Sequence, residues 1–298
     1  MKHFLTIRDF PKQDIEKFLD RALEIKRERK ILDVLKNRCA VLIFEKPSTR
    51  TRVSFEVAVR ELGGYSIFMT PKDSQLGRDE PLKDTARVIS RYAHLMIVRT
   101  FGQNKLEELA EYSTIPVVNA LSNEFHPCQV MSDLLTIYER TPDFSRLKIA
   151  WVGDGNNMAN SWINAATLLP FKLTISCPKG YEPKKELIEE ARSLGANIYF
   201  TYDPKEAVEG ADYVNTDVWA SMGLETDLSK RKEIFRDYQV NEKLLSLAKE
   251  DVRVMHCLPA HRGEEITDDV IESEYSIVWD QAENRLHMQK AILEWLFS

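Results

Sequence analysis

The sequence predicts an α/β protein made of two doubly wound parallel-sheet domains, and three observations lead to this fold class. The length of 298 residues suits two domains of about 100–200 residues each. Short apolar runs alternate with apolar residues at helical spacing, which is the order of β-α-β units and parallel sheets. This alternation is interrupted at Thr141-Pro142-Asp143 and begins again at residue 148. We therefore expect the domain boundary inside or just after a helix at 129–140.

The first half begins with an amphipathic helix expected within 12–30, because Ile15, Phe18, Leu19, Ala22 and Ile25 follow Pro11 at helical spacing. Four buried strands and four further helices then alternate. The expected strands are 39–44, 65–70, 94–100 and 116–121, and the expected helices are 53–62, 82–92, 104–112 and 129–140.

The second half repeats the order of elements without repeating the sequence. The expected strands are 148–154, 172–176, 197–202, 212–218, 253–257 and 276–280, and the expected helices are 157–169, 183–194, 229–236, 241–249 and 283–297. Ligands of open parallel sheets bind at the carboxyl ends of the strands. The residues that follow each strand are therefore the candidates for a functional site.

Composition and charge exclude several classes of function. The formal net charge of −6 provides no global positive field that would attract nucleic acid or an anionic membrane. No apolar stretch approaches the ~18–20 residues of a membrane span, and the N-terminus turns polar too soon for a signal peptide. The four cysteines are far apart in the sequence, which indicates free thiols. We expect a cytoplasmic protein.

The first candidate site follows the strand at 39–44. Ser48, Thr49, Arg50 and Thr51 stand immediately before a predicted helix. Hydroxyl groups beside arginine at a helix N-terminus, with its free N–H groups and positive dipole end, form a phosphate site. A simple helix cap with solvated arginines is the alternative, since Ser and Thr are common caps.

Two further strand ends support an anion site. The strand at 94–100 ends in Arg99-Thr100, and the strand at 116–121 leads to His126-Pro127-Cys128-Gln129. Both loops leave the same edge of the sheet as Arg50, so the three side chains are expected to converge on one small anion. Arg50 would pair with a phosphate in a bidentate manner, and Arg99 or His126 would polarise a carbonyl group.

The second half supplies different chemistry. Gly153-Asp154-Gly155-Asn156-Asn157 follows a strand and resembles a dinucleotide-binding turn, but the third glycine of that motif is missing. An amide at this strand end could instead hold a zwitterionic amino acid. Asp217 lies near the end of the strand at 212–218 and suits an ammonium group, although an aspartate there could equally cap a turn.

The last candidate residues follow the strands at 253–257 and 276–280. Cys257 stands between His256 and His261, so its thiol could bind a cation or act as a nucleophile; a buried inert thiol is the alternative. These three residues also suggest zinc, but no further ligands stand at zinc spacing, so we expect no metal. Arg285 is a third candidate anion ligand at the start of the last helix.

Taken together, these motifs resemble the aspartate/ornithine carbamoyltransferase family, and within it the ornithine-specific enzymes. The resemblance runs from about residue 38 to the last helix and rests on six segments in the family's order. They are Ser-Thr-Arg-Thr-Arg at 48–52 with Ser54-Phe55-Glu56, Ser-Gln-Leu-Gly at 74–77, His-Pro-Cys-Gln at 126–129, Asp217 with Ser221-Met222-Gly223, His-Cys-Leu-Pro at 256–259 and Ala-Glu-Asn-Arg at 282–285.

The resemblance implies a carbamoyl-phosphate domain at 1–135 plus 284–298 and an ornithine domain at 136–283, with the last helix packing back on the first domain. It also implies a cis bond between Leu258 and Pro259. The implied carbamoyl phosphate ligands are Ser48, Thr49, Arg50, Thr51, Gln75, Arg99, His126, Pro127, Cys128, Gln129, Cys257, Leu258 and Arg285. The implied ornithine ligands are Asn157, Asp217, Ser221 and Met222. The implied catalytic residues are Arg50, Arg99, His126, Asp217 and Cys257.

The activity implied is transfer of the carbamoyl group of carbamoyl phosphate to L-ornithine, without a cofactor, in arginine metabolism and most plausibly in its biosynthesis. Gln75 would reach the ligand of a neighbouring subunit, which implies a homotrimer or a multiple of trimers. Gln75, Arg78 and Cys257 differ from the residues of aspartate-specific relatives, and Ser221-Met222-Gly223 favours ornithine over putrescine. The alternatives are a putrescine or aspartate carbamoyltransferase, an NAD-dependent dehydrogenase and a non-catalytic carbamoyl phosphate sensor.

Overall fold

The computed structural model describes residues 1–72, 80–220 and 228–298. The chain divides into two compact units. Unit 1 consists of Met1–Leu135 with Asn284–Ser298, and unit 2 consists of Thr136–Glu283. The boundaries fall within the helices α5 (Pro127–Tyr138) and α12 (Val278–Phe297). Each unit contains its own parallel sheet.

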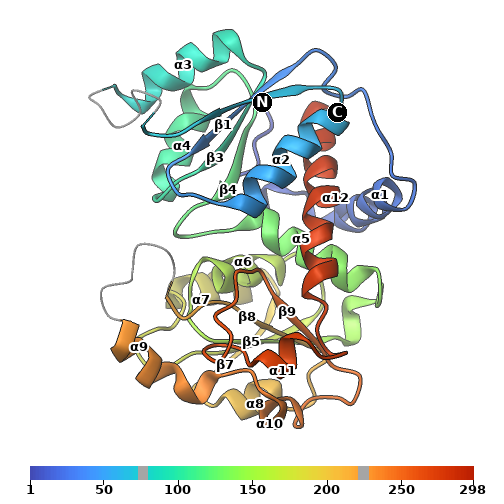
Figure 1. Cartoon of the computed structure of the whole chain (residues 1–298), viewed down its shortest axis with the longest axis vertical. Helices are drawn as coiled ribbons and strands as arrows, with labels where there is room; N and C mark the ends of the chain where they lie inside the picture. The colour runs from blue at the N-terminus through green and yellow to red at the C-terminus, as the bar shows by residue number, and fades with distance from the viewer. Residues whose placement is uncertain (73–79, 221–227) are drawn as a thin grey trace. The chain divides into compact units, whose positions relative to one another are not determined.

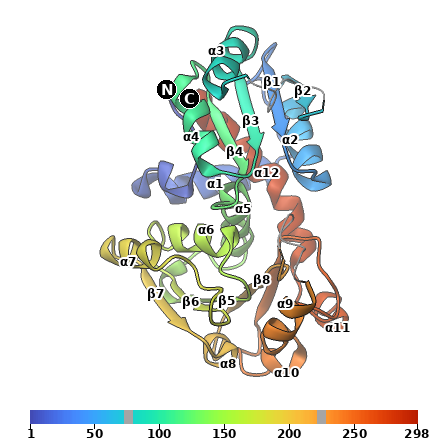
Figure 2. The same ribbon diagram turned by 90° about the vertical axis from the view of Figure 1, so that its left-hand side faces the viewer.

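Unit 1 is built on a four-stranded parallel sheet in the order β2-β1-β3-β4. Figure 1 labels β1, β3 and β4 of this sheet, and Figure 2 also labels β2. Its strands are β1 (Cys39–Phe44), β2 (Tyr65–Met69), β3 (Leu95–Arg99) and β4 (Val117–Leu121). Its helices besides α5 and α12 are α1 (Ile15–Arg27), α2 (Thr49–Glu61), α3 (Leu82–Tyr92) and α4 (Gln103–Tyr112), with the 3₁₀ turns η1 (Ile7–Asp9) and η2 (Lys12–Asp14).

Helices cover both faces of this sheet. Figures 1 and 2 both place α2 on one side of the strands and α4 on the other. All six residues of β1 are buried, as expected for a central parallel strand without a polar face. Alternate residues of β1 and β3, with Ala86 and Leu106 of α3 and α4, form one apolar cluster. Both faces of the sheet are therefore part of the core, and polar groups can occupy the loops that follow the strands.

The C-terminal part of α12 packs on other elements of unit 1, which confirms the predicted return of the last helix. Lys290 is buried, and its Nζ lies 2.6 Å from Oε2 of Glu61, in the last turn of α2. Arg21 of α1 donates two hydrogen bonds of 2.7 Å to the Glu294 carboxylate. Trp295 adds a ring stacked on Phe10, with the centroids 4.2 Å apart.

Unit 2 is built on a five-stranded parallel sheet in the order β7-β6-β5-β8-β9. Its strands are β5 (Lys148–Val152), β6 (Lys172–Ser176), β7 (Asn197–Thr201), β8 (Tyr213–Thr216) and β9 (Arg253–His256). Its helices are α6 (Asn157–Ala165), α7 (Lys185–Ser193), α8 (Pro204–Val208), α9 (Leu228–Phe235), α10 (Glu242–Leu245) and α11 (Asp268–Ile271), with the 3₁₀ turns η3 (Phe144–Arg146) and η5 (Arg236–Tyr238).

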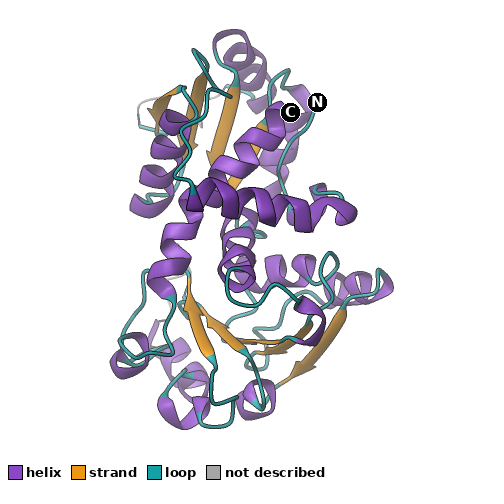
Figure 3. Cartoon of the chain, turned by 90° about the vertical axis from the view of Figure 1, so that its right-hand side faces the viewer, coloured by secondary structure: helices purple, strands orange, loops and turns teal. Residues whose placement is uncertain are grey.

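Helices also lie on both faces of the second sheet. Figure 2 shows α6 on one side and α8 with α10 on the other, and Figure 3 distinguishes the strands from the surrounding helices by colour. Val152 and Val254 contribute to an apolar cluster with Phe235 and Val270 from the covering helices. Both sheets thus have the doubly wound organisation that the sequence predicts.

Strand order identifies one special position in each sheet. In unit 1 the chain leaves β1 toward β2 on one side and later adds β3 on the other, and in unit 2 the same reversal lies between β5 and β8. The loops that follow two such strands turn apart and leave room for a ligand. The loops after Phe44, Arg99, Val152 and Thr216 are therefore the ones placed for binding.

One predicted strand is wrong. Residues 276–280 do not form a strand: Ser276 makes a single parallel bridge with Val254, and α12 begins at Val278. The β-branched pair Ile277-Val278 suggested a strand, but the backbone N–H of Gln281 already donates to the Ile277 carbonyl in a helical turn. Arg285 consequently lies within α12 rather than at its start. None of the helices in the described ranges is both long and apolar enough to cross a membrane.

Candidate active site

In unit 1, the N-terminus of α2 is built by the loop after β1. Ser48 is the N-cap residue in extended conformation, and its side chain accepts a hydrogen bond from the Thr51 N–H at 3.3 Å. Thr49 is exposed, Arg50 is half-buried and Thr51 is buried in the first turn. The free N–H groups of this turn and the positive end of the helix dipole favour an anion here.

Arg285 joins this turn to the start of α5. Its Nη2 donates to Oγ1 of Thr51 at 2.6 Å, and its Nη1 donates to Oε1 of Gln129 at 2.7 Å. Gln129 in turn donates from Nε2 to Oδ1 of Asp133 at 2.9 Å. Arg285, Thr51 and Gln129 are all buried, so the guanidinium is held in one orientation by groups from two helices, α2 and α5.

A second set of positive groups surrounds His126. His126 and Arg99 are buried, and burial followed by the charges of Arg285 and Arg99 lowers the pKa of the imidazole well below its usual range. Lys46 is also buried: its ammonium donates to Oδ1 of Asn123, and burial with the Arg99 charge lowers its pKa. This edge of the sheet therefore concentrates positive charge around a neutral imidazole.

The remaining predicted residues of unit 1 have distinct environments. Pro127 begins α5 and is buried. The Cys128 thiol donates to the Asn119 carbonyl at 3.3 Å, and burial raises its pKa to about 12, so the side chain faces β4 as an inert group. Gln75 and the segment 74–77 lie outside the described residues.

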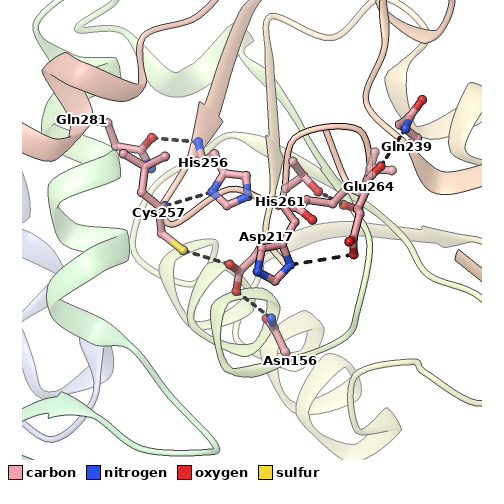
Figure 4. Close-up of polar contacts among 12 residues, drawn as sticks. Asn156, Asp217, Gln239, His256, Cys257, His261, Glu264 and Gln281 are labelled. Atoms are coloured by element: carbon pink, nitrogen blue, oxygen red, sulfur yellow. Dashed lines mark hydrogen bonds and ion pairs between the residues drawn. The ribbon is translucent and has the colours of Figure 1, made fainter. Parts of the chain in front are cut away.

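In unit 2, two polar side chains meet at Asp217, which follows β8. Cys257, which follows β9, donates from Sγ to Oδ1 of Asp217 at 3.1 Å, and Asn156, which follows β5, donates from Nδ2 to Oδ2 at 2.9 Å. Figure 4 shows the side chains of Cys257 and Asn156 approaching the Asp217 carboxylate from these separate loops. A buried carboxylate held at both oxygens suits a ligand ammonium group.

His256 and Glu265 organise the backbone next to Cys257. The backbone N–H of Leu258 donates to Nδ1 of His256 at 2.9 Å, so the ring hydrogen lies on Nε2, which faces Oε1 of Glu265 at 3.0 Å. The Gln281 side chain accepts from the His256 N–H at 2.9 Å. Leu258 has a φ of 58°, and its bond to Pro259 is cis, as the resemblance implies.

A second carboxylate, Asp154, lies beside this cluster. Its Oδ2 is 3.0 Å from Nη1 of Arg231, whose guanidinium also donates to the Trp219 carbonyl and stacks over the Tyr181 ring. Burial nevertheless outweighs Arg231 and, with the like charge of Asp217, raises the pKa of Asp154 to about 6. Arg231 of α9 thus contacts both the loop at 153–156 and the segment that follows β8.

The glycines of the Gly-Asp-Gly turn have a structural explanation. A Cβ on Gly155 would lie 2.5 Å from the Tyr181 carbonyl oxygen and 2.3 Å from the Pro183 nitrogen, so only glycine fits against that loop. Gly153 has a φ of 137°. Backbone packing therefore accounts for the Gly-x-Gly pattern that suggested a dinucleotide.

The cysteine and histidine cluster has the residue types of a metal site, since Asp217, His256 and Cys257 place ligand atoms within 4.8 Å of one another. Both His256 ring nitrogens, however, already contact Leu258 and Glu265. The imidazole therefore has no lone pair directed at the other two residues, and the arrangement suits an ammonium group better than a metal ion.

Sequence reasoning did not single out two residues that the structure places in these clusters. Lys46 precedes the Ser-Thr-Arg-Thr segment, and its position directly after a buried strand could have indicated it. Asn156 was passed over for Asn157, which is the first residue of α6 and is buried. The N-cap preference for asparagine was the available signal for Asn156. Ser221 and Met222 lie outside the described residues.

Comparison with known proteins assigns the two halves of the chain. Residues 2–139 match the carbamoyl-P binding domain of aspartate/ornithine carbamoyltransferase, and residues 145–296 match the Asp/Orn binding domain of the same family. Ornithine carbamoyltransferase of Oleidesulfovibrio alaskensis is 61% identical over 99% of this chain and 98% of its own. The Archaeoglobus fulgidus protein of that name is 54% identical over 98% and 96%.

Solved structures agree. Ornithine carbamoyltransferase from Pyrococcus furiosus superposes with a TM-score of 0.93 at 45% identity, covering 98% of this chain and 96% of its own. The anabolic ornithine carbamoyltransferase from Campylobacter jejuni gives 0.94 at 42% identity, with 99% of each chain covered. Polar clusters on two doubly wound sheets and similarity along the whole length lead to one assignment: the chain belongs to the aspartate/ornithine carbamoyltransferase family.

Proposed function

We propose that the chain transfers the carbamoyl group of carbamoyl phosphate to the side-chain amine of L-ornithine, forming L-citrulline and phosphate. The observation that carries this proposal is the 61% identity, over 99% of the chain, to a protein named ornithine carbamoyltransferase. The two polar clusters support it, because one concentrates positive charge at a helix N-terminus and the other offers a carboxylate and a thiol.

Unit 1 binds carbamoyl phosphate. The phosphate lies on the first turn of α2, where Ser48, Thr49, Arg50 and Thr51 offer hydroxyl and backbone donors, and Arg50 adds a bidentate partner. Arg99 and His126 lie toward the carbonyl oxygen. Because the lowered pKa keeps His126 neutral, its imidazole donates a hydrogen bond to that oxygen as negative charge develops there.

Gln129 and Arg285 complete this end of the donor site. The Arg285 guanidinium contacts both Gln129 and Thr51. These contacts fix the directions of the guanidinium and of the Gln129 amide before carbamoyl phosphate binds. Pro127 and Cys128 contribute through the backbone at the start of α5. The roles proposed for Leu258, on unit 2, and for Gln75, outside the described residues, rest on the family resemblance alone.

Unit 2 binds ornithine. Asp217 attracts the ammonium group of the amino acid, Cys257 lies beside the reacting amine, and Asn157, Ser221 and Met222 supply the remaining contacts. A side-chain amine has an ordinary pKa near 10.4, as in lysine, so it is mostly protonated at neutral pH. Asp217 and Cys257 therefore orient the amine and assist the loss of its proton.

The reaction needs no covalent intermediate with the protein. The neutral amine attacks the carbonyl carbon, a C–N bond forms, the C–O bond to phosphate breaks, and the leaving phosphate accepts the proton lost by the amine. Placement of the reactants and stabilisation of the developing charge supply the rate.

Initial rates with different amines test the proposal. The purified chain is mixed with carbamoyl phosphate and either L-ornithine, putrescine or L-aspartate, and the carbamoylated product is quantified. We expect citrulline formation to exceed the other two reactions by a factor of about 100 or more in kcat/KM. Faster turnover of putrescine or aspartate would identify a different member of the family, and a thermal shift with NAD but no turnover would favour a dehydrogenase.

The assembly that fits this site is a homotrimer or a multiple of trimers. Support comes from unit 1, where Val53 and Val57 lie one turn apart on α2 and are exposed, and Tyr65 and Ile67 are exposed on the edge strand β2. Apolar side chains exposed on packed neighbours indicate an interface. Light scattering of Ile67→Asp should show smaller species than the wild type, whereas equal masses would contradict the interface.

The cellular setting follows from the same chemistry. All four cysteines are free, as is usual in a reducing compartment, which supports a cytoplasmic location. Citrulline formation serves arginine metabolism, and the similarity to an anabolic enzyme favours biosynthesis.

A further inference from the structure

Asn156 makes two kinds of hydrogen bond at once. Its Oδ1 accepts from the backbone N–H groups of Met158 at 2.9 Å and Ala159 at 3.3 Å, which caps α6. Its Nδ2 donates to Oδ2 of Asp217 at 2.9 Å. Because both backbone groups can only donate, the amide oxygen must face the helix and the amide nitrogen must face the carboxylate. The cap therefore fixes which end of the amide meets Asp217.

The opposite side of Asp217 is held as well. Cys257 donates to Oδ1 at 3.1 Å, so each oxygen of the carboxylate has a donor from a different loop. Figure 4 shows Asn156 and Cys257 approaching the carboxylate from different sides. With both oxygens held, rotation of the carboxylate about its last bond would break at least one hydrogen bond.

Charged and titratable groups lie around the Asp217 carboxylate. Asp154, from the same loop as Asn156, carries a like charge whose interaction with Asp217 is offset by Arg231 of α9. The other titratable groups facing Asp217 are Cys257 and His256, whose Nδ1 accepts from the Leu258 N–H and whose Nε2 faces Glu265. The Asn156 amide is thus a direct neutral donor to Asp217 that no protonation can remove.

We propose that Asn156 is a positioning residue for the acceptor site: it fixes the direction of the Asp217 carboxylate, so that ornithine binding depends on it. This inference rests on the proposed function, since it names the support of the ornithine ligand Asp217. It differs from a simple capping role, which requires only an oxygen at this position.

Two substitutions separate positioning from capping. Asn156→Ser and Asn156→Asp both keep an oxygen that caps helices about as well as asparagine. Serine lacks the amide N–H group that reaches Asp217, and aspartate replaces it with a second carboxylate that must share a proton with Asp217. Asn241 provides the matched control, because its Oδ1 caps α10 through the Leu244 N–H at 2.9 Å and its Nδ2 faces Gln239.

Steady-state kinetics give the first readout. We expect the KM for ornithine to rise about tenfold or more in Asn156→Asp and by a smaller factor in Asn156→Ser, with the KM for carbamoyl phosphate within about twofold of wild type. The acid limb of the kcat/KM profile for ornithine should move to higher pH in Asn156→Asp, because paired carboxylates hold a proton more tightly. Asn241→Asp and Asn241→Ser should leave both quantities unchanged.

The second readout does not need turnover. Cys39, Cys128 and Cys177 are buried and Cys257 is partly exposed, so alkylation by iodoacetamide in the native state reports on Cys257. Release of Asp217 in Asn156→Ser should remove the acceptor of the thiol proton and change the alkylation rate severalfold. If both Asn156 variants retain the wild-type KM, pH profile and alkylation rate, Asn156 is only a cap and the inference is wrong. A wild-type chain that forms no citrulline would instead contradict the proposed function, and the alkylation rates would still decide whether Asn156 controls Asp217.

Discussion

Arg285 and Thr51 are 234 positions apart in the sequence, and Nη2 of the arginine donates to Oγ1 of the threonine at 2.6 Å. The contact connects α12 to the first turn of α2, where the phosphate is proposed to bind. The same guanidinium reaches Gln129 at 2.7 Å. One planar group thus aligns two other members of the proposed donor site.

This geometry predicts that lysine cannot replace Arg285. A single ammonium cannot make both contacts in the fixed fork of a guanidinium. We expect Arg285→Lys to raise the KM for carbamoyl phosphate about tenfold or more while the KM for ornithine changes less. Thr51→Val removes one acceptor and should give a smaller effect in the same direction. Wild-type kinetics in Arg285→Lys would show that a positive charge at this position is sufficient for binding carbamoyl phosphate.

Arg50 is predicted to contribute to catalysis mainly by binding the phosphate group of carbamoyl phosphate. Arg50→Gly removes a bidentate partner of a largely desolvated dianion, so kcat/KM for carbamoyl phosphate should fall by about 100-fold or more. Arg52→Gly is the matched control, because Arg52 lies on the same helix but pairs with Glu56 at 3.0 Å and stacks over the Phe68 ring. If both variants lost activity equally, damage to α2 would be the explanation, and the phosphate role of Arg50 would be withdrawn.

Substitution of Cys257 should affect ornithine, the carbamoyl acceptor, more than carbamoyl phosphate, the carbamoyl donor. Serine keeps a hydroxyl that can donate to Asp217, but an oxygen is smaller than sulfur and its hydrogen bonds are shorter. Cys257→Ser is expected to raise the KM for ornithine severalfold and to leave binding of carbamoyl phosphate, measured by calorimetry, within about twofold. An equal loss for both substrates would contradict the division of roles between the two units.

The lowered pKa of His126 predicts how the stability of the folded chain changes with pH. Its pKa in the folded chain lies well below the ordinary 6.5, so below pH 6.5 the unfolded chain binds more protons at this residue than the folded chain does. Stability from this residue is therefore complete above pH 6.5 and is lost as the pH falls, by up to about 1.4 kcal/mol per pH unit for one proton.

Urea unfolding of wild type and His126→Gln between pH 7.5 and 5 measures this effect. Asp154, with its pKa raised to about 6, acts in the opposite direction, because its folded form binds more protons than its unfolded form between its ordinary pKa and about 6. Asp154 is present in both proteins, so its contribution cancels in the difference between their free energies of unfolding. We expect the wild type to lose stability relative to His126→Gln as the pH is lowered; a constant difference would mean that His126 titrates normally.

Elements with a strong local pattern could be predicted from the sequence. The run at 39–44 is a strand with the expected bounds because it is apolar throughout and buried on both faces. The helices α8 and α11 were not expected, since segments of five and four residues are too short for a helical period to be visible. The segment 276–280 was misassigned because β-branched residues also occur at the start of a long buried helix.

Candidate site residues were predictable where a functional side chain stands at or soon after the end of a strand. Arg99 and Asp217 lie at the ends of β3 and β8, where strand order places them at binding loops, and His126 lies in the loop between β4 and α5. Contacts between distant segments were not predictable in this way. Nothing local shows that Arg285 meets Thr51, or that Asn156 rather than Asn157 faces Asp217, because these contacts depend on side-chain direction in the folded chain.

The structure of the protein with a bisubstrate analogue that joins a phosphonate to ornithine is the most direct test of the proposed reaction. We expect the phosphonate within hydrogen-bond distance of Arg50 and of the backbone N–H groups at 48–51, and the amino-acid part at Asp217. A complex with the phosphonate bound elsewhere and an unoccupied first turn of α2 would contradict the assignment of donor and acceptor to the two units.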